Sequence, residues 1–399
     1  MSERRHVSER RYVRVAYPWR AVIDVSSDHA LAFFVRLAAQ ALRYGMPTQR
    51  RFGWLLGRIA RTDAFPEKMT RTILRTLRRT PDAAVDTLLK DVALHWPQFL
   101  ARGAPLPVDP PSLTALSLRR SAATTVFVFG SSSTPLLVLK IPLRQGMAVD
   151  NEVRALRAVE DTSIAPRDLG MVGRAYVQEG LPGESMRVVP MFGVADARTL
   201  AWTPAHAGLT AALGRLAAAT TKREQPVELA DSKIDRAIDA ARLSTPARRA
   251  VAAAGRDLRA VDSAVLRHVD TSPQNCLFLP GEAVPKLVDW ELARPSATPG
   301  FDLWNSATAY HDDSLGLGRW SQEGVVQTFE AGWEHAPFWS EARIAARTLA
   351  CESGVRETLV DALEVAFFAR RVATRLEDPL DFATNAQTAA QQLEVVCAL

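Results

Sequence analysis

Two short stretches decide the fold of this chain: HVDTSPQN at residues 268–275 and KLVDWE at residues 286–291. The first places Asn275 five residues after Asp270, and the second places Asp289 at the end of a short apolar run. Carboxylate and amide oxygens suit Mg²⁺, which normally also keeps phosphate oxygens and water as ligands. A DxxxxN pattern alone arises by chance in many chains, whereas HxDxxxxN followed by an apolar run and Asp-Trp-Glu is specific. The combination is typical of a magnesium site next to a base.

The two stretches resemble the catalytic and metal-binding segments of the aminoglycoside phosphotransferase and choline kinase-like family, whose core is protein-kinase-like. The resemblance implies that Asp270 accepts or orients the proton of an acceptor hydroxyl. It also implies that Asn275 and Asp289 hold Mg²⁺. His268 matches the family's motif histidine, and we group it with Asp270 as a catalytic-loop residue that supports the backbone. The family usually has Gly where Val269 stands.

An ion pair is predicted between Lys140, in the apolar run 138–141, and Glu152, twelve residues later in a helical pattern. Kinase-like enzymes use such a pair to hold a strand lysine against the α and β phosphates of the nucleotide. A lone lysine in a strand is otherwise usually an edge residue that faces solvent. Glu160 is the alternative partner.

The segment YVQEGLPGE, residues 176–184, looks like the family's hinge between lobes. The resemblance implies that the backbone of Gln178, Glu179, Gly180 and Leu181 binds the adenine edge of ATP. The loop that covers the phosphates is expected near residues 119–124. Gly-rich loops let backbone amides approach phosphates closely, but this segment has no glycine. GTP is therefore kept as the alternative nucleotide.

Further acidic residues follow the metal segment. Asp302 stands thirteen residues after Asp289, where the family has an Asp that steadies the catalytic loop through hydrogen bonds. Glu291 is either a neighbour exposed to solvent or a group that reaches a metal or a cationic substrate. The run HDD at residues 311–313 is interpreted as a polar turn, with a metal site or binding of an amine-bearing acceptor as the alternatives.

The order of the expected elements predicts an α+β, two-lobed, protein-kinase-like fold. Residues 1–105 carry mostly helical periodicity, at 30–44 and 69–100, and lead into four prolines at positions 105–111. Such a proline run reads as a stiff linker and a domain boundary. Strands are expected at 113–118, 124–129, 136–141 and 174–179, and a helix at 149–159. We therefore predict a basic helical N-terminal extension at 1–105, a small β-rich N-lobe at 112–180 and a mainly helical C-lobe at 181–399.

Composition places the chain among ordinary globular proteins, with 47% apolar and 23% charged residues among 399. Three scattered cysteines suit a reducing compartment, and we see no signal peptide or membrane-spanning run, so a cytoplasmic location is expected. Residues 1–80 hold 17 Lys or Arg against 6 Asp or Glu. This excess reflects either solvated helix faces or a region that contacts an anionic surface or partner. No motif supports nucleic-acid binding.

The resemblance implies magnesium-dependent transfer of the γ-phosphoryl group of ATP to a hydroxyl of a small molecule. Aminoglycosides, amino alcohols and sugar-like compounds are the acceptor classes. No Ala-Pro-Glu motif follows Asp289, which favours a small acceptor over a protein. The alternative is a catalytically inactive, pseudokinase-like protein that binds a nucleotide or a partner. The missing loop glycines suit that alternative, whereas the base, both metal ligands and the Lys–Glu pair favour an enzyme.

Overall fold

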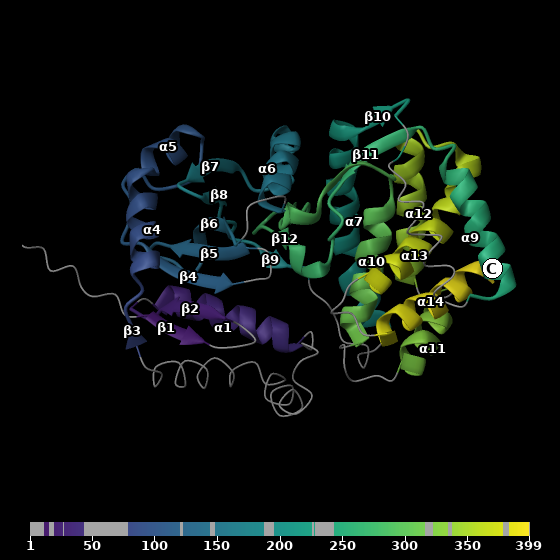
Figure 1. Cartoon of the computed structure of the whole chain (residues 1–399), viewed down its shortest axis with the longest axis horizontal. Coiled ribbons are helices and arrows are strands. Elements are labelled where there is room, and N and C mark those ends of the chain that lie inside the picture. Colours follow the sequence, from purple (N-terminus) through teal and green to yellow (C-terminus); the bar gives the residue numbers. More distant parts are fainter. Residues whose placement is uncertain are drawn as a thin grey trace, which may run out of the picture. The chain divides into compact units, whose positions relative to one another are not determined.

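The described residues of the chain form two compact units, one rich in strands and one mainly helical, as expected for a two-lobed α+β fold (Figure 1). Unit 1 is Met1–Glu160 with Pro166–Gly183, and unit 2 is Asp161–Ala165 with Glu184–Leu399. The computed structural model describes residues 12–15, 20–26, 28–43, 79–119, 123–143, 148–186, 195–225, 227, 243–315, 322–333, 337–377 and 383–398.

Unit 1 is built on one eight-stranded sheet whose neighbouring strands are all antiparallel. Its central strands are largely buried, and β5 and β6 also contain half-buried residues, as expected for a sheet that is covered on both faces. In spatial order the strands are β3 (Arg79–Thr80), β1 (Tyr12–Val15), β2 (Ala21–Asp24), β4 (Thr114–Arg119), β5 (Ala123–Phe129), β6 (Pro135–Pro142), β8 (Ala175–Glu179) and β7 (Asp168–Val172). The four strands expected from the sequence are β4, β5, β6 and β8.

The N-terminal strands correct the predicted division of the chain. The described residues within 1–105 are not a separate helical extension, because β1, β2 and β3 lie in the same sheet as the predicted N-lobe, and β2 pairs directly with β4. The hydroxyl of Tyr12 donates to Asp86 at 2.6 Å, which ties β1 to the helix at Ala83–Leu94. The proline segment is not a free linker either, since the indole N–H of Trp96 donates to the carbonyl of Pro107 at 2.9 Å. Strands of four residues or fewer are too short to show a clear alternation in the sequence.

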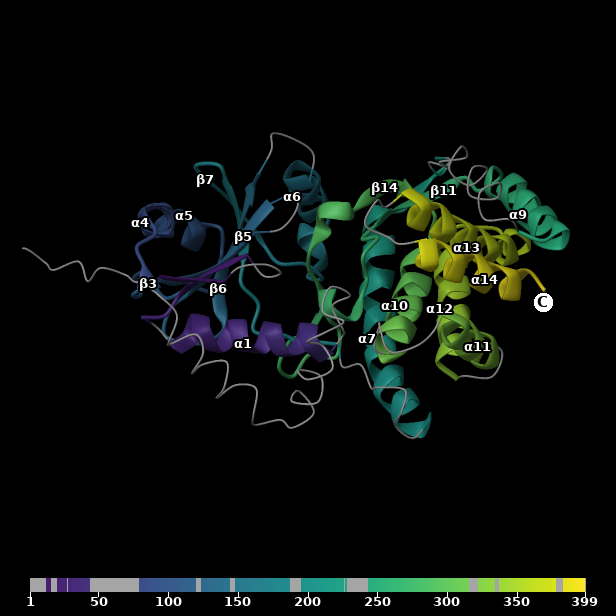
Figure 2. The ribbon, with the colours of Figure 1, turned by 60° about the horizontal axis from the view of Figure 1, so that its bottom comes forward.

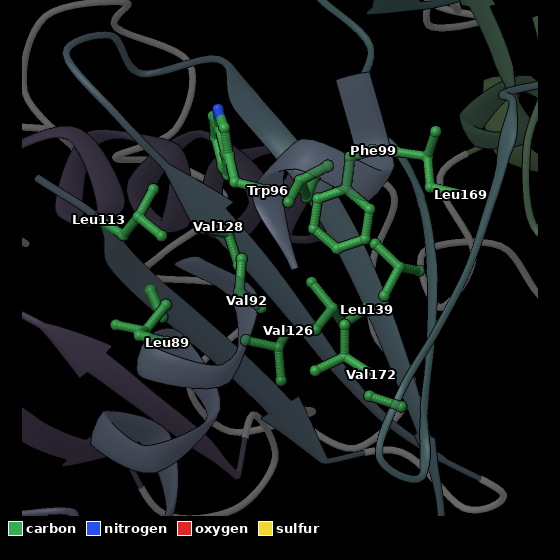
Figure 3. Packing of buried hydrophobic residues seen from close by; sticks show 14 of the residues in the cluster. Leu89, Val92, Trp96, Phe99, Leu113, Val126, Val128, Leu139, Leu169 and Val172 are labelled. Atoms are coloured by element: carbon green, nitrogen blue, oxygen red, sulfur yellow. The ribbon is translucent and has the colours of Figure 1, made fainter. Parts of the chain in front are cut away.

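Helices cover both faces of this sheet (Figures 1 and 2). They are α1 (Asp28–Arg43), α4 (Ala83–Leu94), α5 (Trp96–Ala101) and α6 (Ala148–Ala158). On one face α4 and α5 bury Trp96 and Phe99 against side chains that include Val126, Val128 and Leu139 (Figure 3). On the other face α1 packs on β2, β4 and β5, and α6 packs on β6 and β7.

Unit 2 is mainly helical and carries two small three-stranded sheets. Its helices are α7 (Ala195–Thr220), α9 (Thr245–Leu258), α10 (Phe301–Leu315), α11 (Gln322–Trp333), α12 (Pro337–Glu352), α13 (Val360–Glu377) and α14 (Ala383–Cys397). The sheets are β10 (Lys222–Arg223), β11 (Ser263–Arg267) and β14 (Arg294–Ala297), and β13 (Lys286–Leu287), β12 (Cys276–Phe278) and β9 (Glu184–Ser185). Within the described residues, no helix combines the length and apolar character needed to cross a membrane.

Candidate active site

The catalytic-loop motif begins where β11 ends, and one buried carboxylate holds it in place. Asp302, in the first turn of α10, accepts the backbone N–H of His268 at 2.8 Å and that of Val269 at 3.1 Å. The guanidinium of Arg267 lies 3.0 Å from the same carboxylate, and both side chains are buried. The hydroxyl of Thr271 donates to the backbone carbonyl of Asp302 at 2.6 Å. These contacts confirm the expected role of Asp302, and Arg267 is a partner that sequence reasoning missed.

Val269 has a backbone conformation that explains why a glycine was expected there. Its φ is +75°, in the left-handed region that a β-branched residue rarely adopts. Such a residue stores on the order of 1–3 kcal/mol of strain and persists only when its surroundings hold it. The hydrogen bond from Val269 to Asp302 is part of that restraint.

His268 is a buried positioning residue. Its Nε2 lies 2.9 Å from the carbonyl oxygen of Val288, and its ring packs edge-on against Trp290 at a centroid distance of 4.5 Å. Because a carbonyl only accepts, Nε2 carries the proton. Burial lowers the pKa of His268, against the opposing influence of Asp302 and two further carboxylates, so the ring is neutral. His268 therefore links the loop to the metal segment and is not itself the base.

Asn275 and Asp289, the predicted metal ligands, lie on segments that are hydrogen-bonded to one another. The amide Nδ2 of Asn275 donates to the backbone carbonyl of Asp270 at 3.0 Å. The amide oxygen of Asn275 is the atom of this side chain that can bind a metal ion. The backbone N–H of Val288 donates to the carbonyl of Asn275 at 3.0 Å. Asp289 follows at once and has a left-handed backbone, with φ of 68°. The loop and the metal segment are thus brought together as the sequence predicts.

The donor set of these two residues fits magnesium. Both would offer hard oxygen atoms, and Mg²⁺ is typically bound by one or two protein groups together with substrate phosphates. Among the described residues no group of three His, Cys, Asp or Glu side chains is arranged to hold a metal ion. A closed, all-protein site is therefore not seen in the described part of the chain.

Asp270 has the surroundings expected of a group that contacts a substrate. Its side chain is half-buried, and its carboxylate forms no hydrogen bond or ion pair with any described residue. Its backbone is fixed by Asn275, and the neighbouring Thr271 is fixed by Asp302. The loop is therefore rigid while the carboxylate itself is left for another partner.

In unit 1, Lys140 and Glu152 form the predicted ion pair, with Nζ 2.7 Å from the carboxylate. Lys140 lies on β6 and Glu152 on α6, and their side chains are 7% and 0% exposed. Removing charges from water is costly unless they are paired, and here each buried charge has its counter-charge within 2.7 Å. Tyr176, opposite Lys140 on β8, is buried beside the pair. Burial, with the charges of Asp168 and Glu152, raises its pKa and keeps its phenol neutral.

The predicted hinge residues lie at the end of β8, close to Gly183, where unit 1 ends. The backbone N–H of Glu179 donates to Arg167 at 3.1 Å, and that of Gly180 donates to Leu136 at 2.9 Å. Both amides are thus used within unit 1. The N–H of Leu181 forms no hydrogen bond with the described part of the chain.

Gln178 and Gly180 have surroundings that the sequence did not show. The side chain of Gln178 is buried, and its Oε1 has no hydrogen-bond partner among the described residues. A Cβ on Gly180 would lie 2.1 Å from the carbonyl oxygen of Pro135, so only glycine fits this close approach. The hinge glycine is therefore explained by packing.

The prediction of a polar turn at residues 311–313 is wrong for His311. His311 is not in a polar turn: it lies inside α10, buried, with ring centroids 5.9 Å from Phe329 and 5.8 Å from Trp339. The side chains at 312 and 313 lie outside the described residues, as do positions 120–122 of the expected phosphate loop. All three cysteines are free, as expected.

Comparison with known proteins gives a family match. Residues 114–346, more than half of the chain, match the model of the phosphotransferase enzyme family. No curated protein matches the sequence significantly.

Several solved structures resemble the chain at low identity. A proposed aminoglycoside phosphotransferase from Ralstonia eutropha is 15% identical, with a TM-score of 0.45, 76% of this chain covered and 97% of that one. A choline/ethanolamine kinase family protein from Mesorhizobium loti is 17% identical, with a TM-score of 0.39, covering 75% and 92%. The Plasmodium vivax ethanolamine kinase is 11% identical, with a TM-score of 0.41, covering 79% and 89%. All three TM-scores lie below 0.5.

Proposed function

Because this chain belongs to the phosphotransferase enzyme family, we propose that it is a small-molecule kinase that transfers the γ-phosphoryl group of ATP, as the magnesium complex, to a hydroxyl group. Aminoglycosides, amino alcohols and sugar-like compounds are the acceptor classes, and GTP is the alternative donor. Phosphoryl transfer needs little covalent chemistry from the protein, so positioning and charge stabilisation supply most of the rate. Each residue's proposed role follows from the part of the substrates or the ion that its side chain would position.

One observation carries the proposal. The backbone of the loop that bears Asp270 is held by hydrogen bonds, whereas the carboxylate of Asp270 has no hydrogen-bond partner among the described residues. Asp302 holds the loop by its backbone, while Asp270 presents a carboxylate that accepts no hydrogen bond from the described residues. A general base must be within hydrogen-bond reach of the proton that it accepts. Asp270 would orient the acceptor hydroxyl and take its proton as the new O–P bond forms.

Lys140 would bind phosphate oxygens of the nucleotide. Its ammonium is buried and held by Glu152, so little side-chain entropy is lost when it meets a phosphate. Asn275 and Asp289 would hold magnesium through one amide oxygen and one carboxylate. When bound, the ion would neutralise charge on the phosphates. The backbone around Leu181 would receive the edge of the base.

Nucleotide turnover with pooled acceptors tests the proposal. Purified full-length protein with Mg²⁺ and ATP or GTP would be mixed with pools of aminoglycosides, amino alcohols and sugars, and nucleoside diphosphate release followed. Asp270→Asn keeps the shape of the side chain and removes the base. Asp262→Asn is the matched control, because Asp262 is an exposed carboxylate just before β11.

Acceptor-stimulated release in the wild type and in Asp262→Asn, lost by at least about 100-fold in Asp270→Asn, is the expected result. Equal release from all three proteins would exclude Asp270 as the base. If the wild type binds Mg-ATP or Mg-GTP but transfers to no acceptor, the pseudokinase-like alternative takes its place.

A further inference from the structure

The strand register of unit 1 defines which side chains share a face with Lys140. Residues directly opposite each other in neighbouring strands lie on the same face of a sheet. Lys140 of β6 is opposite Thr125 of β5, and two residues away Val138 is opposite Phe127. Val138 is also opposite Gln178 of β8. Lys140, Val138, Phe127 and Gln178 therefore lie on one face, which we call the lysine face.

Two helices pack on the lysine face. Helix α6 supplies Glu152, which pairs with Lys140 over one half of the sheet. Helix α1 packs over the other half, where the ring of Phe33 lies 4.9 Å from Phe127 and 5.2 Å from Phe129. The opposite face of the sheet is occupied by α4 and α5 (Figure 3). The nucleotide-binding lysine and the N-terminal helix are thus on the same side.

Burial differs between the two faces in the same strands. On the α4 and α5 face, Val126, Val128, Leu137 and Leu139 are all buried. On the lysine face, Lys140, Tyr176 and Gln178 are buried, whereas the apolar side chains of Phe127, Val138 and Phe33 are only half-buried. Beside these apolar groups, Gln178 is buried with an Oε1 that has no partner among the described residues. The lysine face therefore offers half-buried apolar side chains next to the Oε1 of Gln178, which has no partner among the described residues.

The spacing between Lys140 and Phe127 suits a nucleotide. Phe127 is a diagonal cross-strand neighbour of Lys140, at roughly 7–8 Å, a gap that a ribose can bridge. A nucleotide whose phosphates bind Lys140 would extend its planar base over Val138 and Phe127. The base would then meet Phe33 at its outer edge, with the amide of Gln178 in reach of its polar groups.

We propose that Phe33 of α1 is a base-contacting residue of the nucleotide site, so that the N-terminal region is part of the active site. This inference rests on the proposed function, since it takes Lys140 as the phosphate-binding residue. It goes beyond the family match, because α1 ends at Arg43 and the match begins at residue 114. Contact between a base and an aromatic ring tolerates both purines, as every base has an apolar face.

Calorimetric titration of the full chain with Mg-ATP and with Mg-tripolyphosphate tests this assignment, because the second ligand has phosphates but no base. Phe33→Ala removes the ring, and Phe33→Leu removes its aromatic character while keeping apolar volume. Leu37→Ala is the matched control, since Leu37 is one turn along α1, half-buried and packed on the same apolar cluster. Lys140→Met reports on phosphate binding.

We expect Phe33→Ala to weaken Mg-ATP binding about tenfold, and Phe33→Leu by less, with Mg-tripolyphosphate binding unchanged in both. Leu37→Ala should leave both affinities unchanged, and Lys140→Met should weaken both. Unchanged Mg-ATP affinity in Phe33→Ala, or tighter binding, would overturn the assignment of Phe33 alone. Absence of Mg-ATP and Mg-GTP binding by the wild type would instead overturn the proposed function, and the inference with it.

Discussion

The carboxylate of Asp302 accepts the backbone N–H of His268 at 2.8 Å, and this contact connects the first turn of α10 to the loop that carries Asp270. The same carboxylate neutralises the buried guanidinium of Arg267 at 3.0 Å. One side chain therefore fixes a backbone conformation and compensates a buried charge.

Replacement of Asp302 by Asn should destabilise unit 2 and stop turnover. The change leaves the charge of Arg267 buried without a counter-charge, which costs about 3–5 kcal/mol. Urea unfolding followed by circular dichroism measures the loss. Asp262→Asn should stay within about 0.5 kcal/mol of the wild type. Equal stability of the two variants would show that the contact contributes nothing.

Replacement of Val269 by Gly should be well tolerated. Glycine adopts a φ of +75° without strain, which offsets the side-chain contacts that the change removes. We expect the free energy of unfolding to stay within about 1 kcal/mol of the wild-type value. The matched control is Val288→Gly, a half-buried valine whose φ is not positive, and we expect it to cost more. If Val269→Gly lowered the free energy of unfolding more than Val288→Gly, the backbone of Val269 would not be strained.

Replacement of Glu152 by Gln should destabilise unit 1 by about 3–5 kcal/mol, because Lys140 stays buried without its counter-charge. The double change Lys140→Met with Glu152→Gln removes both charges and should recover most of that loss. Neither protein should bind Mg-ATP as the wild type does. Chemical unfolding of the single and double variants measures the coupling, and simple additivity would argue against the pair.

Removal of magnesium should abolish part of the thermal stabilisation by nucleotide. A ligand that binds only the native state raises the melting temperature, and Asp289 is a proposed ligand of the ion. We expect the stabilisation by ATP to fall on chelation in the wild type and in Asp262→Asn. Asp289→Asn should show little dependence on Mg²⁺. A magnesium-dependent shift of normal size in Asp289→Asn would remove this residue from the metal site.

Stability should decline in mild acid because of His206, on α7. Burial lowers its pKa to about 4, below the 6.5 typical of histidine in an unfolded chain. Above pH 7 both states are neutral and the residue contributes no pH dependence. As the pH falls below about 6.5 the unfolded state binds a proton that the native state does not, which costs about 2 kcal/mol at pH 5. In His206→Leu the urea midpoint of unfolding should depend less on pH between pH 7 and 5 than in the wild type. An equal pH dependence in the two proteins would show that other groups cause the loss of stability.

Local patterns accounted for most of the candidate site. The motif at 268–275 and the segment ending at Asp289 are close in sequence, so a short hairpin is enough to bring them together. Lys140 and Glu152 are twelve residues apart on a strand and the helix that follows it, and that spacing already favours a contact. The paired strands β4, β5 and β6 could be predicted because each is a stretch of six to eight residues rich in apolar, β-branched or aromatic side chains.

By itself the sequence indicated the family, which the family match confirms, and it predicted which residues would serve as base, metal ligands and phosphate-binding lysine. The tertiary structure alone decided where the described residues among the first 105 belong, because their strands have four residues or fewer and β2 pairs with β4 more than ninety residues away. It also decided that Arg267 is buried against Asp302, and that Phe33 lies on the face that bears Lys140. Burial and long-range pairing depend on which elements pack together, and that information is not local to any stretch of the chain.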